Sequence, residues 1–338
     1  MTDVEVLVVG GGPIGLAAAI EARLAGHDVA VVEARRGPLD KACGEGLMPG
    51  TVRALHRLGV DPPGRALLGI SYRARGAHVD HRFRGTPGRG VRRTTLVEAL
   101  RARADEIGVG HVTARVRDVE VTGDAVRAAG MTARHLLACD GLHSAVRRGL
   151  GLERPARGLP RYGLRRHFAV TPWTDLVEVH WGRAAEAYVT PVTDDVVGVA
   201  LLGAPRTDWA TTLGGLPELT QRLEGATELG PVLGAGPLRQ RTSARTLGPV
   251  RLVGDASGYV DALTGEGLRV GLAQARAAVA TLDDPTAYER AWIRATRDYR
   301  VLTAGLVGWA TSPARGAVVP VARSAPWLYG RAVERLAR

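Results

Sequence analysis

Six residues near the N-terminus have the types and spacing of a dinucleotide-binding turn. The sequence Gly10-Gly11-Gly12-Pro13-Ile14-Gly15 matches G-x-G-x-x-G. In such a turn the first glycine permits the bend, the second lets the backbone approach a pyrophosphate, and the third allows a helix to pack closely on a strand. The free N–H groups and the dipole at the start of that helix favour a phosphate ligand. We therefore predict that Gly10, Gly12, Pro13, Ile14 and Gly15 bind the cofactor.

The segments around this turn have the pattern that such a site requires. Val4–Val9 is an apolar, β-branched run typical of a buried strand, and Ile14–Leu24 is alanine-rich with helical spacing. A second buried run, Val29–Val32, ends at Glu33, which we expect to accept hydrogen bonds from the adenosine ribose. This unit predicts a dinucleotide but does not distinguish NAD from FAD. The predicted contacts at the end of the second run are Glu33, Ala34 and Arg35.

Two later strand-like runs also end at an aspartate. The segment 136–147 ends a strand in Asp140-Gly141, and the segment 252–258 ends another strand in Gly254-Asp255. A carboxylate at the end of a buried strand can contact sugar-like hydroxyls. FAD has a ribityl chain, whereas a nicotinamide cofactor has none. The three motifs together therefore predict FAD.

With these motifs the chain resembles the glutathione-reductase-type flavoproteins of the p-hydroxybenzoate hydroxylase and geranylgeranyl reductase superfamily, over residues 1–58, 91–148 and 250–282. The resemblance implies that Asp255 binds the ribityl chain and that Gly254 allows its approach. It also implies that Arg93 contacts the cofactor. Asp140 is expected to help hold both the flavin region and the path along which the pyridine nucleotide reaches it. For each of these two residues a simpler alternative stays open. Asp140 then only stabilises the turn at the end of its strand, and Arg93 is then an ordinary surface arginine.

Two loops resemble the reductase branch of that superfamily. The segment 41–47 is similar to the Cys-Gly-Gly loop beside the flavin, and the segment 261–268 resembles a Pro-Leu-Thr-Gly-Glu-Gly stretch whose helix start can stabilise a reduced flavin. Glu45 replaces a glycine and Ala262 replaces a proline of these patterns. The predicted cofactor contacts in the two loops are Lys41, Cys43, Gly44, Gly265, Glu266, Gly267 and Leu268.

Substrate and catalytic residues are less clearly indicated. Tyr188-Val189-Thr190-Pro191 only partly matches the Tyr-x-Trp-x-Phe-Pro pattern of the reductases, which argues against a long prenyl substrate. The Trp-x-Trp-x-Ile-Pro pattern of flavin-dependent halogenases is missing, and Lys41 lacks the setting of the halogenase lysine. The candidate catalytic residues are Glu45, Cys43 and Tyr188.

These features predict an FAD-dependent oxidoreductase, first of all a monooxygenase that hydroxylates an aromatic or polyketide-like small molecule in a biosynthetic pathway. The alternatives are a geranylgeranyl-reductase-like enzyme that saturates prenyl C=C bonds, a flavin-dependent oxidase or halogenase, and a flavin-holding accessory protein. Because there is a single dinucleotide motif, NAD(P)H is expected as a transient electron donor without a domain of its own. Electron supply by a separate flavin reductase stays open.

The order of predicted elements gives an α/β fold: a Rossmann-like FAD-binding domain with a parallel sheet, an inserted mixed β-sheet substrate domain, and C-terminal helices. The FAD-binding domain is assigned to residues 1–68, 92–150 and 245–284, the substrate domain to 69–91 and 151–244, and the helical region to 285–338. Among the predicted elements are strands over Gly69–Arg84, His111–Glu120 and Tyr162–Leu202, and helices over Thr94–Ile107 and Thr211–Leu223.

Composition excludes several classes. The net charge is +11, but the arginines are scattered with few aromatics between them, which argues against nucleic acid. Two cysteines without a CxxC partner fit a cytoplasmic protein without disulfides, and no metal site is predicted. The N-terminus lacks the basic region of a signal peptide. The arginine-rich C-terminal segment contains Trp292, Trp309 and Trp327; we favour packing on the core, and contact with a membrane or a lipid carrier stays open.

Overall fold

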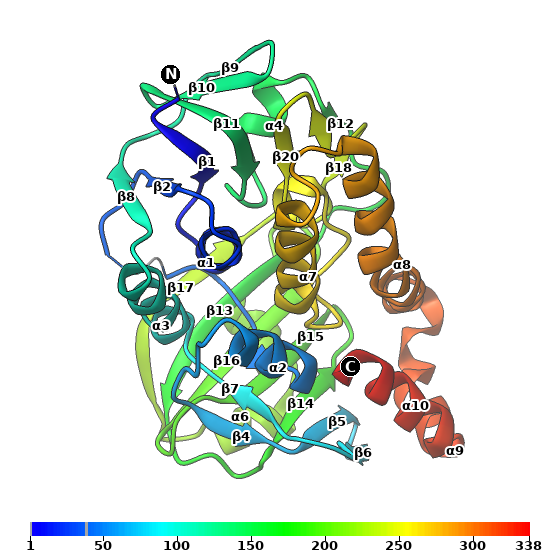
Figure 1. The fold of residues 1–338 in the computed structure, drawn as a ribbon. Coiled ribbons are helices and arrows are strands. Elements are labelled where there is room, and N and C mark those ends of the chain that lie inside the picture. Colours follow the sequence, from blue (N-terminus) through cyan, green and yellow to red (C-terminus); the bar gives the residue numbers. More distant parts are fainter. Residues whose placement is uncertain (1, 38–39) are drawn as a thin grey trace.

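Two large β-sheets organise the chain in the computed structural model, which describes residues 2–37 and 40–338 (Figure 1). The first sheet has the strand order β19-β20-β11-β1-β2-β8, with β10 and β9 attached to β11. Strands β20, β11, β1, β2 and β8 run parallel, so their carboxyl ends reach the same edge. The strands are β1 (Val4–Val9), β2 (Val29–Glu33), β8 (Gly110–Thr113), β9 (Val119–Thr122), β10 (Ala125–Ala128), β11 (Met131–Ala138), β19 (Thr246–Leu247) and β20 (Val250–Leu252).

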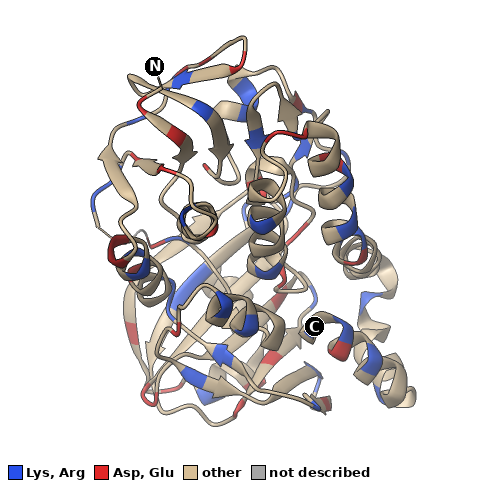
Figure 2. Ribbon diagram, viewed as in Figure 1, with Lys and Arg blue, Asp and Glu red and all other residues tan. Residues whose placement is uncertain are grey.

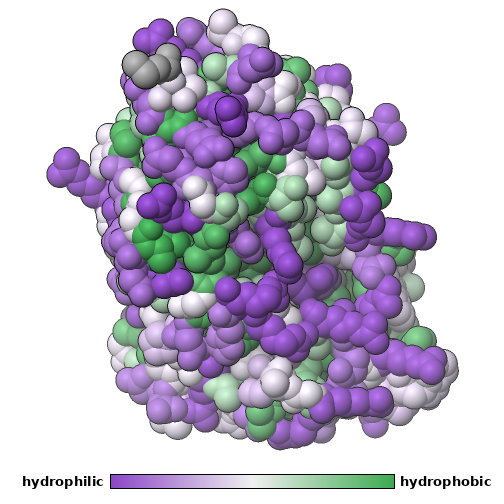
Figure 3. Space-filling view, in the orientation of Figure 1, coloured by the Kyte–Doolittle hydropathy of each residue, from purple (hydrophilic) through white to green (hydrophobic). Residues whose placement is uncertain are grey.

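Helices cover one face of this sheet. The apolar side of α1 packs on β1 and β2 through a fully buried run that includes Leu16 and Ile20, as the helical spacing predicts. Figure 3 shows hydrophobic side chains over α1 and α3 on this face and hydrophilic ones over much of the rest. The helices of this part are α1 (Pro13–Leu24), α2 (Pro49–Arg57), α3 (Arg93–Glu106), α4 (Ala145–Gly149) and α7 (Gly267–Val279), with the 3-10 turn η1 (Gly254–Ser257).

The second sheet has the order β17-β13-β16-β15-β14-β5-β6 and is antiparallel except for the β14–β5 pair. Its outer face is apolar and packs on α5 and α6 through side chains such as Phe168 and Leu219. Its inner face is polar at Arg165 and His167 of β13 and apolar at Val177, Val179 and Trp181 of β14, which pack with residues of the C-terminal helices. The strands are β5 (Gly69–Ala74), β6 (Ala77–Arg82), β13 (Tyr162–Ala169), β14 (Leu176–Trp181), β15 (Ala185–Pro191), β16 (Val196–Gly203) and β17 (Thr227–Ala235).

Two predicted elements are wrong in detail. The helix over Thr211–Leu223 is two helices, α5 (Trp209–Gly214) and α6 (Pro217–Arg222), because Pro217 cannot donate a helical hydrogen bond and begins a new helix. The strand over His111–Glu120 is interrupted, since β8 ends at Thr113 and β9 begins at Val119. Five short strands complete the structure: β3 (Gly46–Leu47), β4 (Arg65–Leu67), β7 (Gly88–Gly90), β12 (Glu153–Arg154) and β18 (Arg241–Thr242).

The C-terminal helices join both sheets. The hydrophobic core between the first sheet and its helices is called the first core, and the core between the second sheet and the C-terminal helices the second core. On α8 (Pro285–Ala310), Tyr288 donates to the carbonyl of Leu252 and packs into the first core. On α10 (Pro326–Ala337), Tyr329 donates to the carbonyl of Ile70. Between them lie η2 (Pro313–Ala317) and α9 (Val318–Ser324). Across the described residues, no helix has both the length and the apolar character needed to cross a membrane.

The predicted α/β fold is confirmed: a parallel sheet, a second mixed sheet and C-terminal helices are all present. The second sheet takes its strands from residues 69–82 and 162–235. The exact domain boundaries stay a prediction.

Candidate functional site

The carboxyl edge of the first sheet brings three distant motifs together. The glycine turn follows β1, Glu33 ends β2, Asp140 follows β11, and Asp255 follows β20. These strands are neighbours in the sheet, so residues as far apart in the sequence as Gly10 and Asp255 share one edge. In open parallel sheets this edge is where ligands bind.

The glycines of the turn are required for different structural reasons. Gly10 has φ 107°, and a Cβ at Gly15 would lie 1.7 Å from the Gly10 carbonyl oxygen, so the chain itself requires both glycines. A Cβ at Gly12 would meet only the Arg93 guanidinium, at 3.8 Å. Gly12 therefore borders open space at the start of α1, where Pro13 is the first helical residue. This is the cradle that a pyrophosphate needs.

The carboxylate of Glu33 is held beside the turn. Its Oε2 accepts a hydrogen bond from the Gly11 N–H at 2.9 Å, and its Oε1 accepts from the Arg35 N–H at 3.0 Å. Ala34 and Arg35 are exposed immediately beyond β2. The structure thus places these residues beside the glycine turn, and their contacts with a ribose stay predictions.

Cations gather at the same edge. Lys41 lies near Arg93 and Arg35, and burial together with these two guanidinium groups lowers the pKa of Lys41. Arg93 is the first residue of α3 and faces Gly12. A group of cations beside a helix N-terminus suits the two negative charges of a pyrophosphate.

Asp140 has one engaged and one free oxygen. Its Oδ2 accepts from the Val146 N–H at 3.2 Å, while Oδ1 is buried without a hydrogen-bond partner among the described residues. The next residue, Gly141, has φ 84° and forms the turn. The first bond agrees with a turn-stabilising role, and the second oxygen is an unused hydrogen-bond acceptor.

Arg147, which the sequence analysis did not single out, ties the Asp140 loop to the Asp255 loop. It is fully buried, and its guanidinium donates to the carbonyls of Leu142 and Ala256. It also donates to the side chains of Glu153 and Gln240. A buried position for an arginine so close to the Asp-Gly motif has no local sequence signal.

The Gly254–Asp255 turn packs against the glycine turn. Gly254 has φ 65°, and a Cβ there would lie 3.2 Å from Ile14 of α1, so Ile14 acts as the spacer between the two motifs. Asp255 is half-buried. Burial raises the pKa of Asp255, and Arg93 and Lys41 oppose this effect.

The loop that contains Cys43 and Glu45 is fixed from several sides. The carboxylate of Glu45 is buried and accepts from the Arg93 N–H at 2.9 Å, while its Oε2 lies 2.6 Å from Nε2 of His167. The Cys43 sulfur accepts from the Glu45 N–H at 3.4 Å. Thr190 of β15 donates to the Gly44 carbonyl at 2.8 Å. The loop is thus attached both to α3 and to the second sheet.

His167 was missed by the sequence analysis, although strand alternation contains the signal. Arg165 and His167 lie on the inner face of β13, opposite Phe168 of the apolar outer face. Arg165 donates to Nδ1 of His167 at 2.9 Å and also bonds to Asp40. A guanidinium has no acceptor, so Nδ1 must accept and the proton of His167 lies on Nε2, directed at Glu45.

Tyr188 of β15 joins the second sheet to the 261–268 loop. The Tyr188 hydroxyl donates to the Leu263 carbonyl at 2.7 Å, and burial and the nearby Glu186 raise the pKa of Tyr188 well above its usual range. Gly265 has φ 67°, and Glu266 turns back to pair with Arg269. Gly267 begins α7, and Leu268 packs against the first core.

A buried cluster of ion pairs, which the sequence analysis also missed, connects the same strand and loop. Glu186 of β15 pairs with Arg161 and with Arg315 of η2, both at 2.5 Å, and Arg161 lies 3.3 Å from Asp261. It therefore links the second sheet, the 261–268 loop and the C-terminal region.

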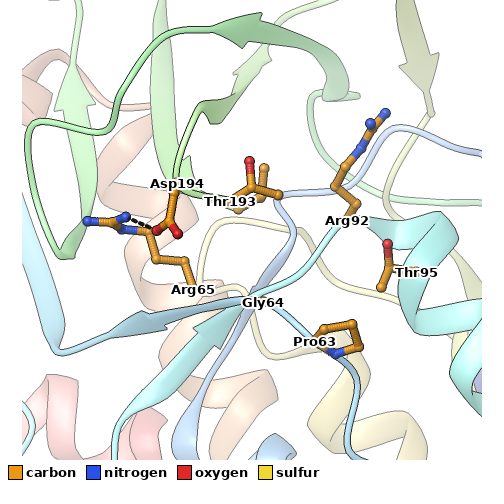
Figure 4. Close-up of a pocket in the computed structure, with 8 residues that line it drawn as sticks. Pro63, Gly64, Arg65, Arg92, Thr95, Thr193 and Asp194 are labelled. Atoms are coloured by element: carbon orange, nitrogen blue, oxygen red, sulfur yellow. Dashed lines mark hydrogen bonds and ion pairs between the residues drawn. The ribbon is translucent and has the colours of Figure 1, made fainter.

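Two cavities lie outside the group of predicted site residues. One, of about 280 Å³, is bounded by the Arg65–Asp194 ion pair and by Arg92 and Thr95 at the start of α3 (Figure 4). The other, of about 510 Å³, lies between Trp181 and the segment from Ala310 to Val319. Neither contains a predicted site residue, so the motifs and not the cavities define the candidate site.

Comparison with known proteins agrees with a flavin site. The model of the family described as "FAD binding domain" matches residues 3–76. The chain is 56% identical over 59 residues to a menaquinone reductase of Mycolicibacterium smegmatis, an alignment that covers 18% of this chain and 14% of that protein. It is 28% identical over 315 residues to a menaquinone reductase of Mycobacterium tuberculosis, covering 82% of this chain and 76% of that protein.

Two further matches were found. The chain is 34% identical over 168 residues to the FAD-dependent monooxygenase OpS4 of Beauveria bassiana, covering 43% of this chain and 39% of that protein. A solved flavoprotein/dehydrogenase from Cytophaga hutchinsonii shares the fold with a TM-score of 0.80 and 18% identity, covering 99% and 96% of the two chains. The open space at Gly12, the cations around it and the free oxygen of Asp140 all fit an FAD.

Proposed function

We propose that this chain, an FAD-dependent oxidoreductase of the p-hydroxybenzoate hydroxylase-type flavoprotein superfamily, acts as a reductase on an unsaturated, quinone-like small molecule. The observation that carries this proposal is the loop with Cys43 and Glu45, which resembles a reductase loop and is fixed by the hydrogen bonds of Glu45 with Arg93 and His167. The relatives named menaquinone reductase, one of which aligns with four fifths of this chain, support the same choice.

The residues have separate roles in this proposal. Gly12, the start of α1, Lys41 and Arg93 hold the pyrophosphate of FAD, and Asp255 holds its ribityl chain. FAD supplies the hydride chemistry, while the protein supplies binding, orientation and electrostatics. A double bond that receives a hydride at one carbon also needs a proton at the other.

Cys43 is the proposed proton donor. Its sulfur accepts the Glu45 N–H, which leaves its own proton free for a substrate carbon. The Glu45 carboxylate already accepts two hydrogen bonds and is therefore a positioning residue in this scheme. Tyr188 positions the 261–268 loop through the Leu263 carbonyl. NAD(P)H is proposed as the transient electron donor, with a separate flavin reductase as the alternative.

The test begins with purified holoprotein reduced without air and mixed with a naphthoquinone that carries an unsaturated prenyl side chain. Flavin reoxidation coupled to a product that keeps two extra hydrogens after its ring has been reoxidised to the quinone in air supports the proposal. Cys43→Ser should slow that step, whereas Cys139→Ala, a change at the other, buried cysteine, should leave the rate within about twofold. Flavin reoxidation without any reduced product would refute the reductase proposal.

A monooxygenase that acts on an aromatic or polyketide-like molecule is the second candidate, favoured by the match to OpS4. Mixing the reduced protein with oxygen separates the two. A transient absorbing species followed by a hydroxylated product would establish the monooxygenase, and slow reoxidation without such a species supports the reductase. Repeating the reaction with halide tests the halogenase alternative, which would give a halogenated product.

A further inference from the structure

The helical pair α9–α10 presents an unusual exposed surface, independent of the reaction at the flavin. Val321, Trp327 and Leu328 are 42%, 63% and 51% exposed, although large apolar side chains normally avoid water. Arg323 and Arg331 are exposed beside them. We call these five residues the tip surface. It lies at the outer corner of the molecule, away from the first sheet (Figure 1).

The tip surface is held rigidly by the opposite side of α10. Tyr329 donates to the Ile70 carbonyl at 2.9 Å, and Glu334 pairs with His81 of β6 at 2.8 Å. Tyr329 and Val333 are buried in the second core. Because this inner face is fixed, Trp327 and Leu328 are directed outward by the helix geometry and not by a loose end.

Charge distinguishes this region from the rest of the chain. Residues 285–338 contain nine arginines and three acidic residues, so they carry +6 of the net +11. Arg323 and Arg331 have no ion-pair partner within the part of the chain that the structure describes, and Arg331 lies over the Trp327 ring at 5.4 Å. Figure 2 shows Lys and Arg outnumbering Asp and Glu along α8, α9 and α10.

We propose that the tip surface docks on an anionic lipid bilayer. Tryptophan and leucine favour burial at the boundary of headgroups and acyl chains, and arginines on either side attract anionic headgroups. A protein partner would need a larger apolar face, whereas five residues in a basic setting suit shallow insertion into a charged surface. In this arrangement the chain lies on the membrane and does not span it.

The test uses the full-length holoprotein and sedimentation with vesicles of phosphatidylcholine, with or without phosphatidylglycerol. We expect binding to the mixed vesicles, weakened by salt, and little binding to phosphatidylcholine alone. Trp327→Ser/Leu328→Ser should weaken binding to mixed vesicles by roughly tenfold or more, because the inserted apolar area is lost. Arg323→Ser/Arg331→Ser should reduce the dependence on phosphatidylglycerol.

Matched controls are Leu159→Ser and Arg154→Ser, which change an exposed leucine and an exposed arginine elsewhere on the surface. These should bind vesicles like the unchanged protein. Unchanged flavin content and melting temperature in every variant exclude misfolding. Failure of the unchanged protein to bind anionic vesicles, or equal binding by the tip variants, would overturn the proposal. The proposal would also be overturned if the unchanged protein did not bind vesicles but formed a dimer that the Trp327→Ser/Leu328→Ser change dissociates. None of these outcomes depends on the reductase activity.

Discussion

His167 of the second sheet donates its Nε2 proton to Oε2 of Glu45 at 2.6 Å, in the loop beside the predicted flavin. Glu45 has φ 57°, a backbone region that favours glycine, and the reductase pattern has a glycine at this position. The departure from that pattern therefore has a physical explanation. The hydrogen bonds from His167 and Arg93 to the carboxylate offset the strain of a side chain in this conformation.

Removing the Glu45 side chain separates these two effects. Glu45→Ala leaves two buried donors unsatisfied and should lower the free energy of unfolding by about 3 kcal/mol. Glu45→Gly loses the same bonds but relieves the backbone, so it should be more stable than the alanine variant by about 1 kcal/mol. Urea unfolding of both variants measures the difference. Equal stability, or a more stable alanine variant, would show that the backbone at position 45 is not strained.

The second and third glycines of the first motif, Gly12 and Gly15, give a matched pair. Gly12→Val should fold but lose FAD, because its side chain enters the open space where the pyrophosphate is expected. Gly15→Val should fail to fold stably, because its Cβ would collide with the Gly10 carbonyl. Flavin absorbance of the purified proteins and circular dichroism melting distinguish these outcomes. Full FAD retention by Gly12→Val would contradict the assignment of the cradle.

Asp255 should favour FAD binding but lower the free energy of unfolding of the FAD-free protein. Burial raises the pKa of Asp255, so the folded state keeps this proton to a higher pH than the unfolded chain. The free energy of unfolding of the FAD-free protein should therefore fall as the pH rises from the usual value of 3.8 through the raised pKa. Asp255→Asn should remove this decline and raise the melting temperature at neutral pH, while lowering FAD affinity. Asp255→Ala should strip the flavin. A lower melting temperature for FAD-free Asp255→Asn would be the opposite of this expectation.

Arg147 should be essential for the stability of the two aspartate loops. Arg147→Lys keeps the charge but cannot reproduce a planar group that donates to several acceptors, so we expect a loss of about 3 kcal/mol. Arg148→Lys, at the exposed neighbouring position, should change stability by less than about 0.5 kcal/mol. Chemical denaturation of the pair provides the measurement. Similar stability of both variants would mean that the buried network contributes little.

Many of the residues at the carboxyl edge of the first sheet could be predicted from the sequence. Gly10, Asp140 and Asp255 each come just after a strand, and Glu33 is the last residue of one; the apolar run of each strand is visible in the sequence. Parallel strands place their carboxyl ends together, so local spacing was sufficient to group these residues. The break at Pro217 was also present in the sequence, but the apolar periodicity of Thr211–Leu223 concealed it.

What only the tertiary structure decided is how that edge is joined to the second sheet. His167 and Glu45 are 122 residues apart, and Arg147 and Ala256 are 109 apart. Such contacts depend on the register of strands and on how one sheet packs against another, and neither leaves a periodic pattern in the chain. The sequence thus determined where the cofactor motifs lie, because turns and strand ends are set by nearby residues. The packing of the two sheets determined which side chains support them, because buried charged groups find partners only in three dimensions.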